Sequence, residues 1–176
     1  MIRAIAALAL ASASAQPTAT LSSAPWWEKV TVTVTDDGKA RSCQYESSLG
    51  AGKSQDCSVS GSEAAMTKSS GAAASAKDQY TRITFERRFN PGARPDKPAL
   101  QAGELLLGGQ VMALAIDGKG AVEHCQVVAT SGSVTPQYGC SEASAERFEA
   151  SATSVRAPAR EGYMTIIVYG HSEHVV

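Results

Sequence analysis

The sequence predicts an α+β fold built from two small repeats, each an antiparallel sheet with a helix packed on one face and a disulfide bond inside it. Three observations lead to this prediction. An alternating strand that ends in an Asp-Gly-Lys turn occurs twice, at residues 30–39 and 111–119. A returning strand with a cysteine follows each turn, and a second cysteine comes after a loop with serine and glycine. Good helix formers follow the last cysteine, with acidic residues in the first turn.

The first fifteen residues are expected to be a signal peptide rather than part of the fold. A single arginine precedes an apolar run from Ala4 to Ala11, and Ala13-Ser14-Ala15 has the small residues that signal peptidase recognises. Export with cleavage after Ala15 follows from this interpretation, and the alternative is an alanine-rich first helix. Residues 16–25 are polar and rich in Ser, Thr and Ala, which predicts a disordered lead.

The four cysteines are an even number in a short exported chain, which indicates a disulfide framework. Of the three possible pairings we expect Cys43–Cys57 and Cys125–Cys140, because each pair lies inside one repeat. Each bond closes a loop of about 15 residues, worth about 3 kcal/mol in the chain-entropy model. Free buried thiols are the alternative. The sequence has no Cys-x-x-Cys pair, so a zinc site is not favoured.

The first repeat, residues 26–90, is predicted to begin with a strand. Valines at 30, 32 and 34 alternate with threonines, which is the period of a strand with one face in water. Asp36-Asp37-Gly38 predicts a tight turn, because glycine accepts a positive φ at no steric cost. Residues 40–47 return, residues 63–68 suit a short helix, and residues 80–89 suit another strand.

Three prolines and a glycine between Asn90 and Pro98 predict a linker, placed at residues 91–103, which leads to the second repeat, residues 104–176. That repeat is expected to contain two paired strands, a helix over residues 140–151 and a final strand from Tyr163 to Tyr169. Its strands are apolar on both sides, so something is expected to cover both faces. The helix would cover one face, and the other repeat or a second molecule would cover the other.

The order of elements over residues 105–170 resembles the carboxy-terminal domain of the TonB energy-transducer family. Asp117-Gly118-Lys119 is similar to the family's hairpin, and residues 126–132 are similar to its returning strand and Ser-Gly turn. Arg147-Phe148-Glu149-Ala150 resembles the end of its helix, and residues 164–168 resemble its last strand. The first repeat is a poorer copy without a convincing helix. A true transducer keeps an uncleaved membrane helix and a long Pro-rich spacer, so the likeness is to an exported, cysteine-bearing branch.

The resemblance implies a periplasmic interaction module that binds a peptide or protein of the cell envelope. Such a domain pairs its partner with an exposed sheet edge through main-chain hydrogen bonds. It implies that the last strand is this edge, with the binding residues Tyr163, Met164, Ile166 and Val168. The alternative is that this strand is core or a dimer seam. The two repeats could pack as a pseudo-dimer, and a homodimer is also left open.

No catalytic constellation stands out, so neither an enzyme nor a cofactor is expected. Gly50-Ala51-Gly52-Lys53-Ser54 looks like the end of a phosphate-binding loop, but Ser47 stands where that loop needs a glycine. His171, Glu173 and His174 do not converge on an extended tail, so metal binding there is only an alternative, as is a structural envelope protein without a groove.

Charge adds little to the choice of partner. The net charge is −1 and there is no basic stripe, so nucleic acid is not an expected partner. His124 precedes Cys125, which would be a reactive thiol only if that cysteine were free.

Overall fold

The computed structural model describes residues 20–34, 40–49, 54–57, 80–95, 99–151 and 158–172. These residues form seven strands and one short helix. In chain order they are β1 (Trp26–Val34), β2 (Ala40–Ser47), β3 (Gln55–Asp56), β4 (Tyr80–Pro91), β5 (Glu104–Ile116), β6 (Val122–Gly132), α1 (Cys140–Ala145) and β7 (Arg160–Ser172).

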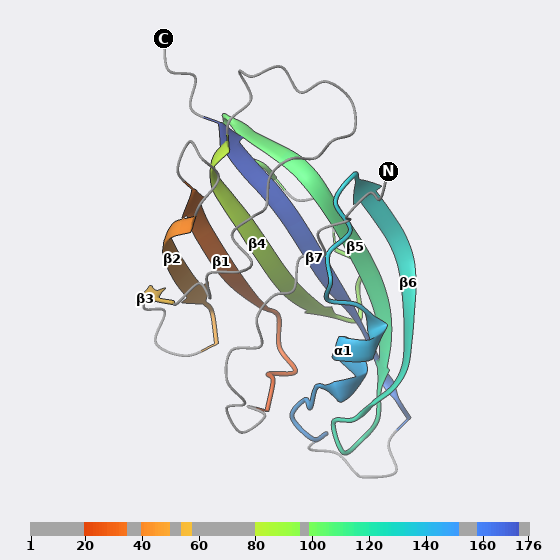
Figure 1. Ribbon diagram of the computed structural model, residues 1–176. Helices are drawn as coiled ribbons and strands as arrows, with labels where there is room; N and C mark the ends of the chain where they lie inside the picture. Colours follow the sequence, from red (N-terminus) through yellow and green to blue (C-terminus); the bar gives the residue numbers. More distant parts are fainter. Residues whose placement is uncertain are drawn as a thin grey trace, which may run out of the picture.

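All seven strands belong to one antiparallel sheet, in the order β3-β2-β1-β4-β7-β5-β6 (Figure 1). The predicted α+β fold with two separate sheets, each carrying its own helix, is therefore wrong. The described residues are mostly β, and their one helix has six residues. The alternating pattern gave the strands correctly, but it did not show that the two halves share a single sheet.

The two halves of the sheet have the same connectivity. In each, a hairpin is followed by a strand that pairs with the hairpin's first strand: β4 returns to β1, and β7 returns to β5. The two returning strands then pair with each other, from Tyr80 opposite Ser172 to Pro91 opposite Gly162. The repeats thus join edge to edge, as a pseudo-dimer with a continuous sheet. The expectation that one repeat covers a face of the other is wrong.

Both expected disulfide bonds are present. Cys43 is bonded to Cys57 with their Cα atoms 5.0 Å apart, and Cys125 to Cys140 with 5.5 Å between Cα atoms. The two bonds do different work. The first holds β3 beside the outer edge of β2, whereas the second ties the start of α1 to β6, across one face of the sheet.

The main hydrophobic core lies on the face of the sheet that α1 covers (Figure 1). A row of apolar cross-strand neighbours runs across the β4–β7 seam, so both halves contribute to it. The core comprises Leu21, Trp26, Phe89, Met112, Leu114, Ile116, Ala143, Phe148, Met164 and Ile166. Leu21 is buried and forms a bridge with Phe148, so the lead that was predicted to be disordered belongs to the fold from residue 20 onwards.

The helix predicted over residues 140–151 ends at Ala145, and the chain beyond it is extended. Phe148 is the physical reason. Its ring is buried against Phe89, with 4.7 Å between ring centroids, and its backbone N–H donates to the carbonyl oxygen of Gly120 at 2.8 Å. Gly120 has a φ of +85°, and a Cβ atom there would collide with the carbonyl oxygen of Phe148. A longer helix would carry Phe148 out of these contacts.

Several expectations fall outside the described residues: the signal peptide at residues 1–15, the turn at Asp36-Asp37-Gly38 and the helix at residues 63–68. Among the helices that the structure describes, none has the length and apolar character needed to cross a membrane.

Candidate functional site

The strand expected to be a peptide-binding edge lies in the middle of the sheet. β7 pairs with β4 on one side and with β5 on the other. Met164, Ile166 and Val168 are buried, and Tyr163 is half-buried. The interpretation of β7 as an open edge is therefore wrong, and the alternative of a core strand is the one the structure has. Its apolar character on both faces is typical of a central strand covered on both sides.

The edge of the sheet at β2 is closed along part of its length. β3 pairs there with Gln44 and Tyr45, and the backbone N–H of Cys57 donates to the carbonyl oxygen of Cys43 at 3.1 Å. The Cys43–Cys57 bond keeps this short strand in place. A covered edge cannot serve as a template for another chain.

The opposite edge, β6, has no further strand beside it among the described residues. It is eleven residues long and exposed along most of its length. Val127 and Val128 are the most exposed large apolar side chains of the sheet after Leu105, at 41% and 38%. A bulge between Val111 and Met112 leaves Val128 out of the pairing with β5, so two consecutive valines meet solvent.

The composition of β6 does little to prevent strand addition. Natural edges are commonly protected by lysine or proline, and this strand contains neither. Glu123 is its one charged carboxylate, and it lies near the hairpin turn. Alternate residues of an edge strand direct their N–H and C=O groups away from the sheet. The stretch from Val127 to Ser131 therefore offers unpaired main-chain groups next to exposed apolar side chains.

Three features hold this edge in position. At the hairpin, the Asp117 carboxylate accepts the backbone N–H groups of Lys119 at 2.9 Å and of Ala121 at 2.7 Å. At the far end, Gly132 has a φ of +70°, which lets the chain turn from β6 across Gly108 of β5 towards α1. The Cys125–Cys140 bond then fixes α1 against the face of β6. These contacts anchor the strand at both ends and along one face.

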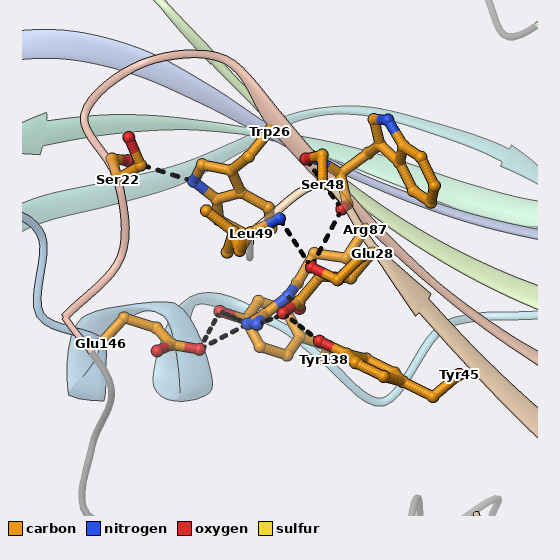
Figure 2. A network of polar contacts seen from close by, with 11 residues as sticks. Ser22, Trp26, Glu28, Tyr45, Ser48, Leu49, Arg87, Tyr138 and Glu146 are labelled. Atoms are coloured by element: carbon orange, nitrogen blue, oxygen red, sulfur yellow. Dashed lines mark hydrogen bonds and ion pairs between the residues drawn. The ribbon is translucent and has the colours of Figure 1, made fainter. Parts of the chain in front are cut away.

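A partly buried polar network on the α1 face joins the two halves (Figure 2). Arg87 of β4 is its centre. Its Nε and Nη2 donate to one oxygen of Glu28, at 3.0 and 2.6 Å, and its Nη1 donates to the hydroxyl of Tyr138 at 3.1 Å and to Glu146. Tyr138 donates in turn to Glu146 at 3.0 Å, and Tyr45 donates to Glu28 at 2.7 Å. Glu28 and Tyr45 belong to the first half, whereas Tyr138 and Glu146 flank α1 in the second.

Burial alone would lower the pKa of Arg87, but Tyr138, Glu28 and Glu146 raise it above its ordinary value. The guanidinium also lies 5.0 Å from the ring centroids of both Trp26 and Tyr138, where its charge meets the ring faces. Arg87 therefore remains charged. Two carboxylates and two aromatic rings surround its guanidinium. The network holds the loop before α1 in place, and α1 in turn packs against β6.

Sequence reasoning missed this network, although a signal for it exists. Along β4 the side chains of Ile83, Phe85, Arg87 and Phe89 alternate onto one face, so the arginine interrupts an otherwise apolar register. Glu28 interrupts the corresponding register of β1. Two opposite charges at apolar positions of neighbouring strands indicate a partly buried ion pair.

Partly buried tyrosines give stability a pH dependence at the alkaline end, and the rise in pKa is larger for Tyr138 and Tyr169 than for Tyr45. Burial raises the pKa of Tyr138 and of Tyr169 above the ordinary 10.0, and Glu146 and Glu86, respectively, add to the rise. The folded chain holds these protons more tightly than the unfolded chain. Their contribution to the free energy of unfolding is therefore complete below about pH 10 and is lost as the pH rises further.

We expect urea unfolding, repeated at increasing pH, to show a free energy that falls above about pH 10. Replacing both tyrosines by phenylalanine should lower the stability at neutral pH but flatten this alkaline slope. An equally steep slope in the Tyr138→Phe, Tyr169→Phe variant would contradict the assignment.

The other candidate residues do not converge on a site. His124 is exposed on β6, and its neighbour Cys125 is in a disulfide bond, so no reactive thiol exists there. His171 ends β7, whereas Glu173 and His174 lie outside the described residues, as does most of the stretch from Gly50 to Ser54. Within the described ranges, no three His, Cys, Asp or Glu side chains lie close enough to hold a metal ion.

The comparisons with known proteins add nothing to these geometric observations. No protein-family model, no curated protein and no solved structure matches this chain.

Proposed function

We propose that the chain is an exported interaction module that binds an extended segment of a protein partner in the cell envelope, by adding it as a further strand beside β6. The observation that carries the proposal is the long, exposed β6 edge with Val127 and Val128, beside which the described part of the chain places no further strand. Main-chain hydrogen bonds would supply most of the affinity, and contacts of the valines would favour apolar side chains at alternate positions of the partner.

The difference between the two edges supports this choice. One edge is covered by β3 along Gln44 and Tyr45, and a disulfide bond keeps this part covered. At the other edge, the second disulfide bond holds α1 over the face, and no strand of the described residues pairs with the outer main-chain groups of β6. A protein that needed only to avoid association would gain from closing both edges.

Two further points support an exported location and a binding role. The two disulfide bonds are typical of an oxidising compartment, which agrees with the expected signal peptide. The resemblance of residues 105–170 to the TonB carboxy-terminal domain favours recognition of peptides by strand addition. Because β4 occupies the edge of β7, the proposal places the partner on the other side of the hairpin, at β6.

The proposal can be tested with extended seven-residue peptides selected from a displayed library. We expect a selected peptide to slow amide hydrogen exchange along β6, at alternate residues, and to leave β2 unchanged. The Val128→Lys variant places a charge at the edge and should weaken binding at least about tenfold.

Gln44→Lys, on the exposed face of β2 at the other edge, is the matched control and should bind normally. Failure to select any binder would contradict the proposal. So would a peptide that protects another segment or binds Val128→Lys as well as it binds the unchanged chain.

A further inference from the structure

A cavity of about 470 Å³ lies on the face of the sheet opposite α1. Its floor is built from cross-strand neighbours: Trp27 of β1 stands beside Arg88 of β4, and Arg88 stands beside Thr165 of β7. The linker after β4 borders it through Pro95 and Ala99. This volume falls within the roughly 300–1,000 Å³ that is usual for small-molecule sites.

Thr165 carries a buried polar atom with no partner. The residue is 5% exposed, and its hydroxyl oxygen makes no hydrogen bond to any residue that the structure describes. A buried hydroxyl nearly always has a partner, because burial without one costs free energy. Thr165 lines the cavity, so a bound molecule could supply this partner.

Arg88 gives the cavity a positive group. Its Nε donates to Glu86, which is buried, and Glu86 also lies 3.7 Å from Lys29 and accepts a hydrogen bond from Tyr169 at 3.2 Å. Two cations thus flank one carboxylate. No contact occupies the two Nη groups of Arg88 within the described part of the chain, and a pair of such donors matches the geometry of a carboxylate.

Apolar surface lies next to these polar groups. Trp27 and Ile167 line the cavity from the sheet, and Pro25 and Pro95 line it from the segments beside the sheet. An indole ring next to aliphatic side chains favours a flat or aliphatic body over a highly hydrated one. The polar groups would orient such a ligand, and the apolar lining would bury its remainder.

We propose that this cavity binds a small organic carboxylate with an apolar body. The ligand's carboxylate accepts hydrogen bonds from the Nη groups of Arg88 and from the hydroxyl of Thr165. Its apolar body packs against Trp27 and Ile167. The site is separate from the β6 edge, because no residue of β6 lines the cavity.

Phenylacetate is a suitable probe, with benzyl alcohol as its uncharged counterpart. We expect phenylacetate to bind with a Kd of about 1 mM and to shift the amide resonances of Thr165 and Ile167, and benzyl alcohol to bind at least about tenfold more weakly. Arg88→Gln should weaken phenylacetate binding about tenfold, because a charge-assisted pair is lost.

Thr165→Val separates binding from folding. Since the hydroxyl has no partner among the described residues, its removal should leave the melting temperature unchanged or raise it, while phenylacetate binding falls about fivefold. Thr31→Val is the matched control. Its hydroxyl lies 3.2 Å from that of Thr84 on the same face, outside the cavity, so it should leave the Kd unchanged.

Three results would overturn the proposal: no saturable shift with phenylacetate, equal binding of benzyl alcohol, or an unchanged Kd in Thr165→Val. The Val128→Lys variant should bind phenylacetate normally, so failure of this proposal is distinguishable from failure of the β6 proposal.

Discussion

Replacement of Arg87 by alanine is expected to lower the free energy of unfolding by about 3–5 kcal/mol. The side chain is only 21% exposed, and its loss removes the cation that pairs with the carboxylates of Glu28 and Glu146, which are 17% and 22% exposed. Desolvated charges that lose their partner cost much more than exposed ones. Chemical denaturation of the purified, oxidised chain measures the loss directly.

Three further variants make this result specific. Arg87→Lys keeps the charge but not the fork of donors, so it should recover only part of the loss. The triple variant Glu28→Gln, Arg87→Met, Glu146→Gln removes all three charges together and should be far more stable than Arg87→Ala. Arg82→Ala, at an exposed position of the same strand, should change stability by no more than about 0.5 kcal/mol. A loss below about 1 kcal/mol for Arg87→Ala would show that water screens the network.

Local chemistry was enough to predict the hairpins and the disulfide bonds. The alternation of valine and threonine after Trp27 and the Asp117-Gly118 turn depend on neighbours in the chain, and the structure has strands on each side. The cysteine pairs were predicted because each pair closes a short loop within one repeat, and both pairings are confirmed.

Neighbour relations between distant strands were not predictable in the same way. Alternation shows which face a side chain occupies, but it does not show which strand lies beside it. An apolar pattern on both faces of β7 fits a binding edge as well as a central strand. Only the pairing of β7 with β4 decides between these two interpretations. The helix after Cys140 was predicted too long for a related reason. Phe148 packs against Phe89, which is distant in the sequence, and this contact ends the helix early.

The candidate sites depend on such long-range relations even more strongly. In the sequence, Val127 and Val128 belong to an ordinary apolar strand. Only the strand order of the sheet shows that this strand lies at an edge. Trp27, Arg88 and Thr165 are far apart in sequence, and only the register of three strands makes them neighbours. A single sequence therefore predicts the elements here, whereas the candidate sites required the strand order.

The second large effect is expected for Phe148→Ala, with a loss of about 3–5 kcal/mol in the free energy of unfolding. Phe148 is 2% exposed and packs against Phe89, which stacks in turn on Trp26 with 6.1 Å between centroids. Alanine leaves a cavity at the seam between the halves. Leu105→Ala is the control for a side chain that is 57% exposed, and it should cost no more than about 0.5 kcal/mol.

The same variant tests whether the two halves are one cooperative unit. Phe148 comes from the second half, whereas Phe89 and Trp26 come from the first, and the β4–β7 pairing joins their backbones. The Phe148→Ala loss should therefore appear equally in the hydrogen exchange of protected amides in β1 and in β5, because opening either half breaks the shared sheet. If β1 kept its protection while β5 lost it, the halves would be independent domains that merely touch, and the single-sheet account of stability would be wrong.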